Sequence, residues 1–209
     1  SPLPNIGDVL DNLVGSIPLD VPEALTVSGV NGGDRLIYVR QEGDPSISIV
    51  SPYEAAYSVG LVAPDPLKYG AIERAVSTNL PSSLGGLTVP FTVPFAVNSV
   101  TISGNAQVDN DGNAVTYPRI LVYGPVSDAR LTNVSTGETL FVNLAISAGE
   151  YLDLDFTNHT AYLNGTASRR GNVSGTWFSL AAGSNFIAFN SSAYSASASV
   201  QVIWRDAWK

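Results

Sequence analysis

The chain has 209 residues, of which 44% are hydrophobic and only 13% are charged. It contains no Cys, so disulfides, thiolate metal sites and a cysteine nucleophile are excluded, and stability has to come from packing and strand pairing. Eighteen acidic against ten basic residues give a net charge of −8 without a basic cluster. This balance argues against nucleic acid and anionic lipid as partners.

No apolar stretch approaches the roughly 20 residues that span a bilayer. The chain starts Ser1-Pro2-Leu3-Pro4, without the charged and apolar regions of a signal peptide. We therefore expect a soluble, unexported protein without membrane insertion. The absence of Met, even at position 1, indicates a processed or truncated chain whose native N-terminal part is incomplete.

The length allows one large or two small domains, and we expect two. Residues 5–14 carry apolar side chains at helical spacing and predict a short helix. From residue 24 the period becomes two, which predicts strands over 24–30, 35–40 and 46–51, and a half-buried strand over 53–63.

Gly, Pro and Ser are frequent in residues 70–86, around a possible short helix at 71–76, so we expect a linker there. Residues 87–97 then alternate between large apolar side chains and Thr, Pro or Ala. Pro90 and Pro94 remove backbone donors from one side of this segment, which a strand tolerates at the edge of a sheet. We predict an edge strand over 87–97.

The rest of the chain predicts about eight short strands, over 100–107, 115–123, 138–146, 150–156, 161–164, 176–180, 185–190 and 196–204. Turn residues such as Gly124-Pro125 and Asn164-Gly165 separate them. Many short, evenly spaced strands favour an all-β fold with an antiparallel sandwich or jelly roll over parallel βαβ units.

Residues that could carry chemistry are few. His159 is the only histidine and has no partner at a recognisable spacing. Asp153 and Asp155 lie on the same face of a strand, about 7 Å apart, but their alternation with Leu152, Leu154 and Phe156 puts them on its wet side. No nucleophile elbow, phosphate loop or zinc motif occurs, so we expect a protein that is not an enzyme and has no cofactor.

Two further patterns admit binding. Residues 109–113 carry oxygen ligands at alternating positions, but Gly112 and Ile120 stand where a calcium loop has other residues, so a hairpin turn is favoured. The alternation 198–204 puts Trp204 in the core. Trp177 could lie in the core or offer a platform for a sugar ring, and Trp208 is the tryptophan expected to be exposed or at an interface.

Residues 117–209 resemble the C-terminal domain of siphophage distal tail proteins, the siphovirus-type tail component. The pieces that carry this resemblance are Tyr117-Pro118-Arg119-Ile120, Tyr123-Gly124-Pro125, Thr132-Asn133, Thr136-Gly137-Glu138, Ala148-Gly149-Glu150-Tyr151-Leu152-Asp153-Leu154-Asp155, Tyr162-Leu163-Asn164-Gly165, Arg169-Arg170, Trp177-Phe178-Ser179-Leu180, Gly183-Ser184-Asn185-Phe186-Ile187 and Trp204-Arg205-Asp206-Ala207-Trp208. Residues 156–160 depart from the family pattern, which puts any family role for that turn in doubt.

Upstream, residues 61–69 and 85–91 are similar to the end of the belt domain and the linker of minor tail proteins from actinobacterial phages. We therefore expect an incomplete belt-type β region at 1–69, a linker at 70–86 and a β-sandwich at 87–209. The short first region puts ring formation by this chain alone in question.

The resemblance implies a galectin-like or carbohydrate-binding-module-like sandwich and a structural role in the virion tail tip, after a soluble stage in the host cytoplasm. The implied partners are five further copies in a hexameric ring of the full-length protein, the tail tube, the tail-associated hub and receptor-binding proteins. The alternative is a module that binds host cell-wall glycans. For interface or glycan contact, the candidate residues are Trp177, Trp208, Arg169 and Arg170.

Overall fold

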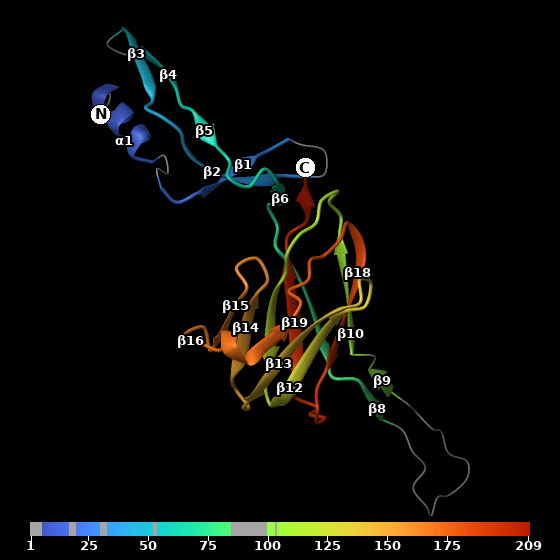
Figure 1. Cartoon of the computed structure of the whole chain (residues 1–209). Helices are drawn as coiled ribbons and strands as arrows, with labels where there is room; N and C mark the ends of the chain where they lie inside the picture. Colours follow the sequence, from blue (N-terminus) through green and yellow to red (C-terminus); the bar gives the residue numbers. More distant parts are fainter. Residues whose placement is uncertain (1–5, 17–19, 30–32, 52–53, 85–99, 103) are drawn as a thin grey trace, which may run out of the picture. The chain divides into compact units, whose positions relative to one another are not determined.

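The computed structural model describes residues 6–16, 20–29, 33–51, 54–84, 100–102 and 104–209 (Figure 1). It forms two compact units, Ser1–Ala71 with Lys209 and Ile72–Trp208, called unit 1 and unit 2 below. Apart from one helix of 10 residues and a short 3₁₀ turn, the described elements are β-strands, and their pairings within each unit are antiparallel. The prediction of an all-β antiparallel fold is confirmed.

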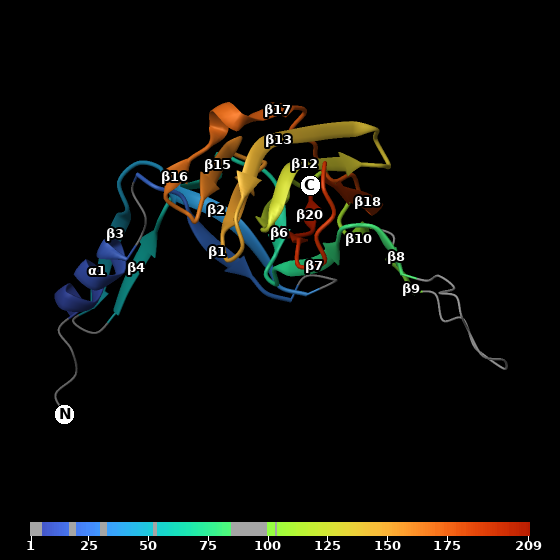
Figure 2. The same cartoon turned by 90° about the horizontal axis from the view of Figure 1, so that it is seen from below.

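Unit 1 consists of a helix and two small sheets (Figure 2). Strands β1 (Glu23–Val27), β2 (Arg35–Gln41) and β6 (Lys68–Gly70) pair in this order, and β5 (Leu61–Val62) also pairs with β2. Strands β3 (Ser46–Ser51) and β4 (Glu54–Ser58) form a separate hairpin. Helix α1 (Ile6–Gly15) agrees with the predicted helix.

The strand predicted over 53–63 is interrupted at Gly60. The Gly60 carbonyl accepts a hydrogen bond from the Glu42 amide at 2.9 Å. A Cβ at this glycine would lie 2.7 Å from the carbonyl oxygen of Glu42, closer than real contacts of this kind. Only glycine therefore allows the backbones at residues 42 and 60 to approach this closely. The predicted strand is divided here into β4 and β5.

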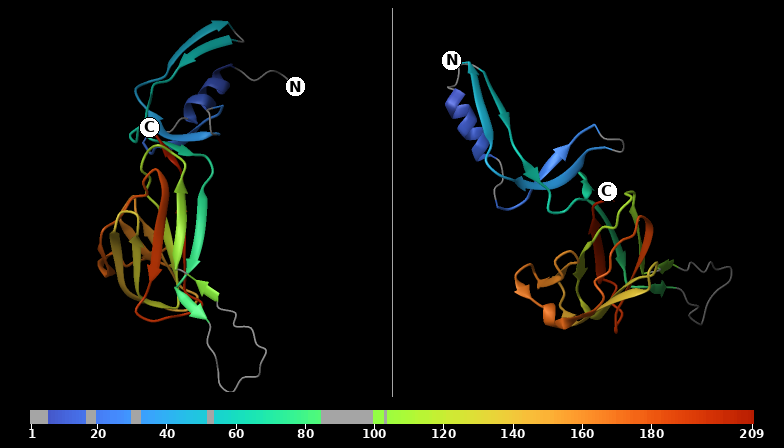
Figure 3. Two further views of the ribbon diagram at one scale, coloured as in Figure 1. Left: turned by 90° about the vertical axis from the view of Figure 1, so that its right-hand side faces the viewer. Right: turned by 45° about the horizontal axis from the view of Figure 1, so that its top comes forward.

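Unit 2 is a sandwich of two antiparallel sheets (Figure 3). The five-stranded sheet has the order β10-β18-β12-β13-β17 and the six-stranded sheet the order β16-β15-β14-β11-β19-β7. The five-stranded sheet contains β10 (Asn105–Asn110), β12 (Val126–Asn133), β13 (Glu138–Ile146), β17 (Val173–Gly175) and β18 (Gly183–Asn190). The six-stranded sheet contains β7 (Arg74–Asn79), β11 (Arg119–Tyr123), β14 (Tyr151–Asp155), β15 (Thr160–Leu163), β16 (Ala167–Ser168) and β19 (Ser199–Trp204).

Shorter elements complete unit 2. Strands β8 (Ser82–Leu84) and β9 (Val100–Ile102) pair with each other. The 3₁₀ turn η1 (Arg170–Asn172) precedes β17, and β20 (Ala207–Trp208) follows β19. The edge strand predicted over 87–97 lies outside the described residues.

The core of unit 2 fills the space between its two sheets. Leu131 and Leu140 enter it from the five-stranded sheet, and Ile120, Leu154 and Val202 enter it from the six-stranded sheet. Because successive side chains of a strand point to opposite faces, one row of apolar residues from each strand suffices to build this core. Each of these five side chains is fully buried, and Trp204 is buried as the alternation predicted.

The structure differs from the sequence predictions at three places in unit 2. Residues 74–79, predicted as linker and in part as helix, form β7 and pair with β19. Residues 176–180, predicted as a strand, make one isolated bridge, between Thr116 and Leu180, and Phe178 of this segment packs in the core. Strand β12 was not predicted. Its bulge between Ser127 and Ala129 shifts the apolar alternation by one residue, which hides the period of two.

Within the described part of the chain, α1 is too short to cross a bilayer, and no other helix there has the length and apolar character to do so.

Candidate functional site

Trp177 is surrounded by three side chains of unit 2. Its ring lies 5.1 Å from that of Phe156 in an edge-to-face arrangement and stacks on the ring of His159 at 5.4 Å. The guanidinium carbon of Arg170 lies 5.2 Å from the ring centre. Trp177 also packs against the core. These contacts anchor the turn that contains His159 and the η1 segment to the sandwich, and they leave little of the ring for a sugar.

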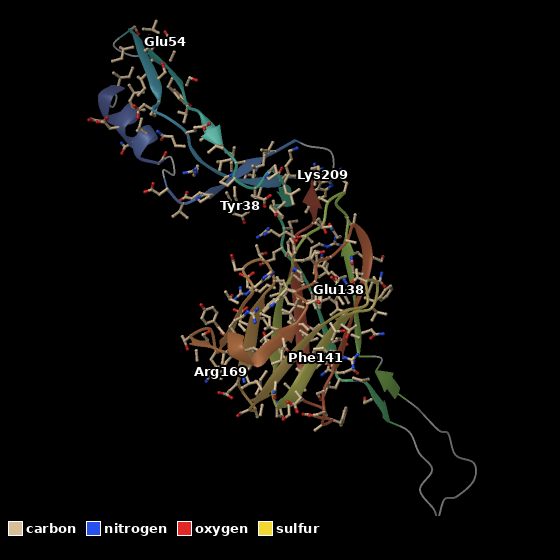
Figure 4. All side chains as sticks on the ribbon, viewed as in Figure 1. Tyr38, Glu54, Glu138, Phe141, Arg169 and Lys209 are labelled. Atoms are coloured by element: carbon tan, nitrogen blue, oxygen red, sulfur yellow. The ribbon has the colours of Figure 1, made fainter. Side chains whose placement is uncertain are left out.

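The other three predicted contact residues have the following local contacts and exposure. Arg170 donates to the carbonyl oxygen of Val173 at 3.0 Å, within its own turn. Arg169 donates to the carbonyl oxygen of Ser168 at 3.1 Å and lies at the left of the molecule in Figure 4. Trp208 is half-buried in β20. The structure therefore places Trp177 and Arg170 together.

The two carboxylates of β14 have structural partners. Asp153 accepts two hydrogen bonds from the Arg119 guanidinium, at 2.8 and 2.5 Å, and this pairing raises the pKa of Arg119 above its usual range. Asp155 accepts from the backbone amides of Thr157 and Asn158 at 2.8 and 3.0 Å, which closes the following turn. His159 has a positive φ of 53° in that turn. These contacts form no acid–base pair around a cleft.

The loop 109–113, considered above as a weak calcium turn, is bound by protein groups. The Asn110 side chain is fully buried, donating to the carbonyl oxygen of Ala114 at 2.8 Å and accepting from the Gly112 and Ala207 amides at 3.1 and 3.2 Å. The Ala114 amide donates back to the carbonyl oxygen of Ala207 at 3.0 Å. Asp109 accepts from the Ser184 hydroxyl at 2.6 Å, which lowers the pKa of its carboxyl.

An ion-pair network extends from this loop. Arg74, at the start of β7, contacts the carboxylates of Asp111 at 2.7 Å and Asp206 at 3.0 Å. Asp206 also accepts from the Asp111 amide at 3.1 Å, and the Trp204 indole donates to the carbonyl oxygen of Asp109 at 3.1 Å. Three segments distant in sequence are thereby held together. Among the described residues, no group of three His, Asp or Glu side chains is arranged to hold a metal ion.

The outer face of the five-stranded sheet carries exposed aromatic side chains that the sequence analysis did not single out. Phe141 of β13 is 45% exposed and lies opposite Arg130 of β12, whose guanidinium carbon is 5.6 Å from its ring centre. Phe186 of β18 is 42% exposed. Figure 4 shows Phe141 on the β12–β13 pair. The sequence does contain a signal for this exposure. Phe141 alternates with the core residues Leu140 and Val142, so its side chain is expected on the face of the strand that points to water.

Unit 1 exposes much of its apolar surface. Among its described residues only Val39 is buried. The large exposed apolar residues of this unit are Val9, Val21, Leu25, Tyr38, Ile47, Ile49, Val50, Tyr57 and Leu61. Four of them, Ile47, Ile49, Val50 and Tyr57, lie on the β3–β4 hairpin, and a two-stranded hairpin is at best marginally stable in water by itself.

Comparisons with known proteins agree with this architecture. Residues 111–208 match the family model of the siphovirus-type tail component, C-terminal domain. The fold is similar to that of the Dit protein (gp 19.1) of phage SPP1, with a TM-score of 0.66 and 14% sequence identity over 98% of this chain and 72% of that one. That structure is described as a paradigm of the hub adsorption apparatus in phages that infect Gram-positive bacteria. No curated protein matches the chain.

Residues 111–208 of unit 2 thus match the C-terminal domain of the siphovirus-type tail component. This match and the fold similarity to the Dit protein agree with the resemblance to siphophage distal tail proteins that the sequence pieces between residues 117 and 209 carry.

Proposed function

We propose that this protein is a structural adaptor of the phage tail tip, in which copies of the chain form a six-membered ring that connects the tail tube to the hub and to receptor-binding proteins. Its task is mechanical rather than catalytic. Unit 1 supplies the contacts between copies, and unit 2 supplies a surface for the other tail proteins.

The observation that carries this proposal is the exposed apolar surface of unit 1. A folded unit of this size needs a hydrophobic core, yet Val39 is its one buried apolar side chain among the described residues. Ile49 is 64% exposed and Tyr57 is 57% exposed. Contiguous exposed apolar residues mark association surfaces, and association of identical chains around a closed symmetry axis is the commonest way to bury them.

The test is the mass and shape of the full chain in solution. Light scattering after size exclusion of the full-length protein should give six times the mass of its single chain, and negative-stain images should show a ring with a central opening. A full-length protein that stays at the mass of a single chain at every concentration, or that forms a closed dimer, would contradict the proposal.

A matched pair of variants locates the interface. Ile49→Asp places a charge on the exposed face of the β3–β4 hairpin and should reduce the ring to smaller species. Val134→Asp makes the same kind of change at a 54% exposed position of unit 2 and should leave the ring intact. Equal behaviour of the two variants would argue against the hairpin as the contact between copies.

A second candidate function is contact with host-surface glycans. The observation that favours it is the exposed Phe141 beside Arg130 on the outer face of the five-stranded sheet. Trp177, one of the residues first considered for this role, already packs against Phe156, His159 and Arg170.

A further inference from the structure

We propose that the outer face of the five-stranded sheet binds a neutral oligosaccharide, in a site that runs from Phe141 to Phe186. This inference gives a place and a ligand class to the second candidate function above, and it does not depend on ring assembly. The site consists of two exposed aromatic rings, the small side chains between them, and the polar groups beside them.

The strand register sets the dimensions of this site. Phe141 of β13 pairs with Arg130 of β12, and Arg130 in turn pairs with Asn190 of β18. Phe186 lies four residues before Asn190 on the same strand, a distance of about 13 Å along its axis. The two aromatic rings therefore mark the two ends of an extended strip across three neighbouring strands, a length that suits a chain of several sugar rings rather than a single small molecule.

The floor of this strip is formed by short side chains. Thr132 and Thr139 pair across β12 and β13, and their hydroxyl oxygens are 3.0 Å apart. Ala188 of β18 pairs with Thr132 on its other side. A ligand can therefore lie close to the sheet between the two phenylalanines. Each aromatic ring offers a flat apolar surface that can cover the C–H face of a sugar.

The charge of the strip indicates an uncharged ligand. The whole chain carries a net charge of −8, but the strip itself has one cation, the guanidinium of Arg130, and one anion, the carboxylate of Asp109. The Asp109 carboxylate accepts from the side chain of Gln107, which pairs with Phe186. The other polar groups are the Thr132 and Thr139 hydroxyls and the Asn190 amide. The Arg130 guanidinium covers one side of the Phe141 ring, so a ligand would contact the part of this ring that stays exposed and accept a hydrogen bond from the guanidinium. Hydroxyls, amides and one charge of each sign complement a polyol better than they complement a charged polymer.

The experiment is affinity electrophoresis of the full-length chain in native gels that contain dextran, galactomannan or hydroxyethyl cellulose, together with a printed array of neutral oligosaccharides. At least one probe should retard or capture the wild-type chain. Phe141→Ala and Phe186→Ala should each weaken the Kd for that probe about tenfold or more, since each removes most of an apolar contact. The control Tyr194→Ala, at another exposed aromatic position of unit 2, should bind as the wild type does.

Several outcomes would overturn the proposal. These are no retention by any neutral probe, equal binding of Phe141→Ala and wild type, or binding of a tail protein at this face without any glycan signal. The melting temperature of each variant shows that it is folded. The mass measurement described above is independent: a monomer that binds a probe through Phe141 would refute the ring alone, and a ring that binds none would refute the glycan site alone.

Discussion

Replacement of Gly112 by Ala should unfold unit 2 at a markedly lower temperature. An added Cβ at Gly112 would lie 1.8 Å from the carbonyl oxygen of Ala207, and real Cβ atoms essentially never approach closer than 3.0 Å. Either this loop or β20, which contains Ala207, must therefore move by more than about 1 Å. This obstacle is backbone, which cannot rotate away as a flexible side chain can.

The magnitude follows from the hydrogen bonds that such a movement breaks. The Ala114 amide bonds to the Ala207 carbonyl oxygen at 3.0 Å, and the Ala207 amide bonds to the side chain of Asn110 at 3.2 Å. All three residues are buried. Each buried group that loses its partner costs about 1–3 kcal/mol, so the free energy of unfolding should fall by about 2–5 kcal/mol. For a chain of this length, this corresponds to a decrease in Tm of about 5–15 °C.

Tryptophan fluorescence during thermal and urea unfolding measures this change, because Trp177, Trp204 and Trp208 are the three tryptophans of the chain and all lie in unit 2. The matched control is Gly171→Ala, since nothing lies within 4 Å of the added Cβ and its φ is not positive. That variant should keep its stability to within about 1 kcal/mol. If Gly112→Ala melts together with Gly171→Ala, the reasoning from the close approach is refuted.

Two further predictions concern the core and the acid sensitivity of unit 2. Leu131→Ala removes a fully buried side chain from the middle of β12 and should lower the free energy of unfolding by about 2–5 kcal/mol. The control Val134→Ala, at an exposed position, should change it by less than about 0.5 kcal/mol. Equal urea midpoints of the two variants would contradict the assigned core. The pKa of Glu150 lies below its ordinary value because the Ser147 amide donates to its carboxylate at 3.0 Å and the Asn164 side chain donates at 3.3 Å. A depressed pKa stabilises the fold above the unfolded value of about 4.3 and loses this effect as the pH falls through the folded value. Glu150→Gln should therefore flatten the loss of stability below about pH 4.3, as measured by urea unfolding across pH; an unchanged acid limb would contradict this assignment.

The sequence predicted those parts of the fold in which alternation is regular. Strands β13, β14 and β19 appeared because their buried residues recur at every second position, as in Val200, Val202 and Trp204. Strand β12 did not appear, because a bulge shifts its phase and the buried Asn133 interrupts the apolar pattern. The sequence does not predict strand β7, because the Gly, Pro and Ser residues around it indicate a linker and its own alternation of small side chains is short.

The candidate sites were less predictable because they depend on which residues meet in space. The hydrogen bond that the Ala207 amide donates to the Asn110 side chain joins segments 97 residues apart in the chain, and no local pattern predicts such a contact. The sequence singles out Trp177 by its residue type, but its ring packs against Phe156 and His159. The exposed Phe141 was overlooked, because an aromatic residue inside a strand is usually assigned to the core.

The position of β19 in the six-stranded sheet also constrains how the protein is made. This strand lies between β11 and β7, and Arg74 of β7 pairs with Trp204, about 130 residues later in the chain. At ribosomal rates of about 5–20 residues per second, β7 waits on the order of ten seconds for its neighbour to be synthesised. During translation the edge of β11 that will pair with β19 therefore stays unpaired. Only chains whose synthesis has passed residue 204 can complete the sheet and become available for assembly into a virion.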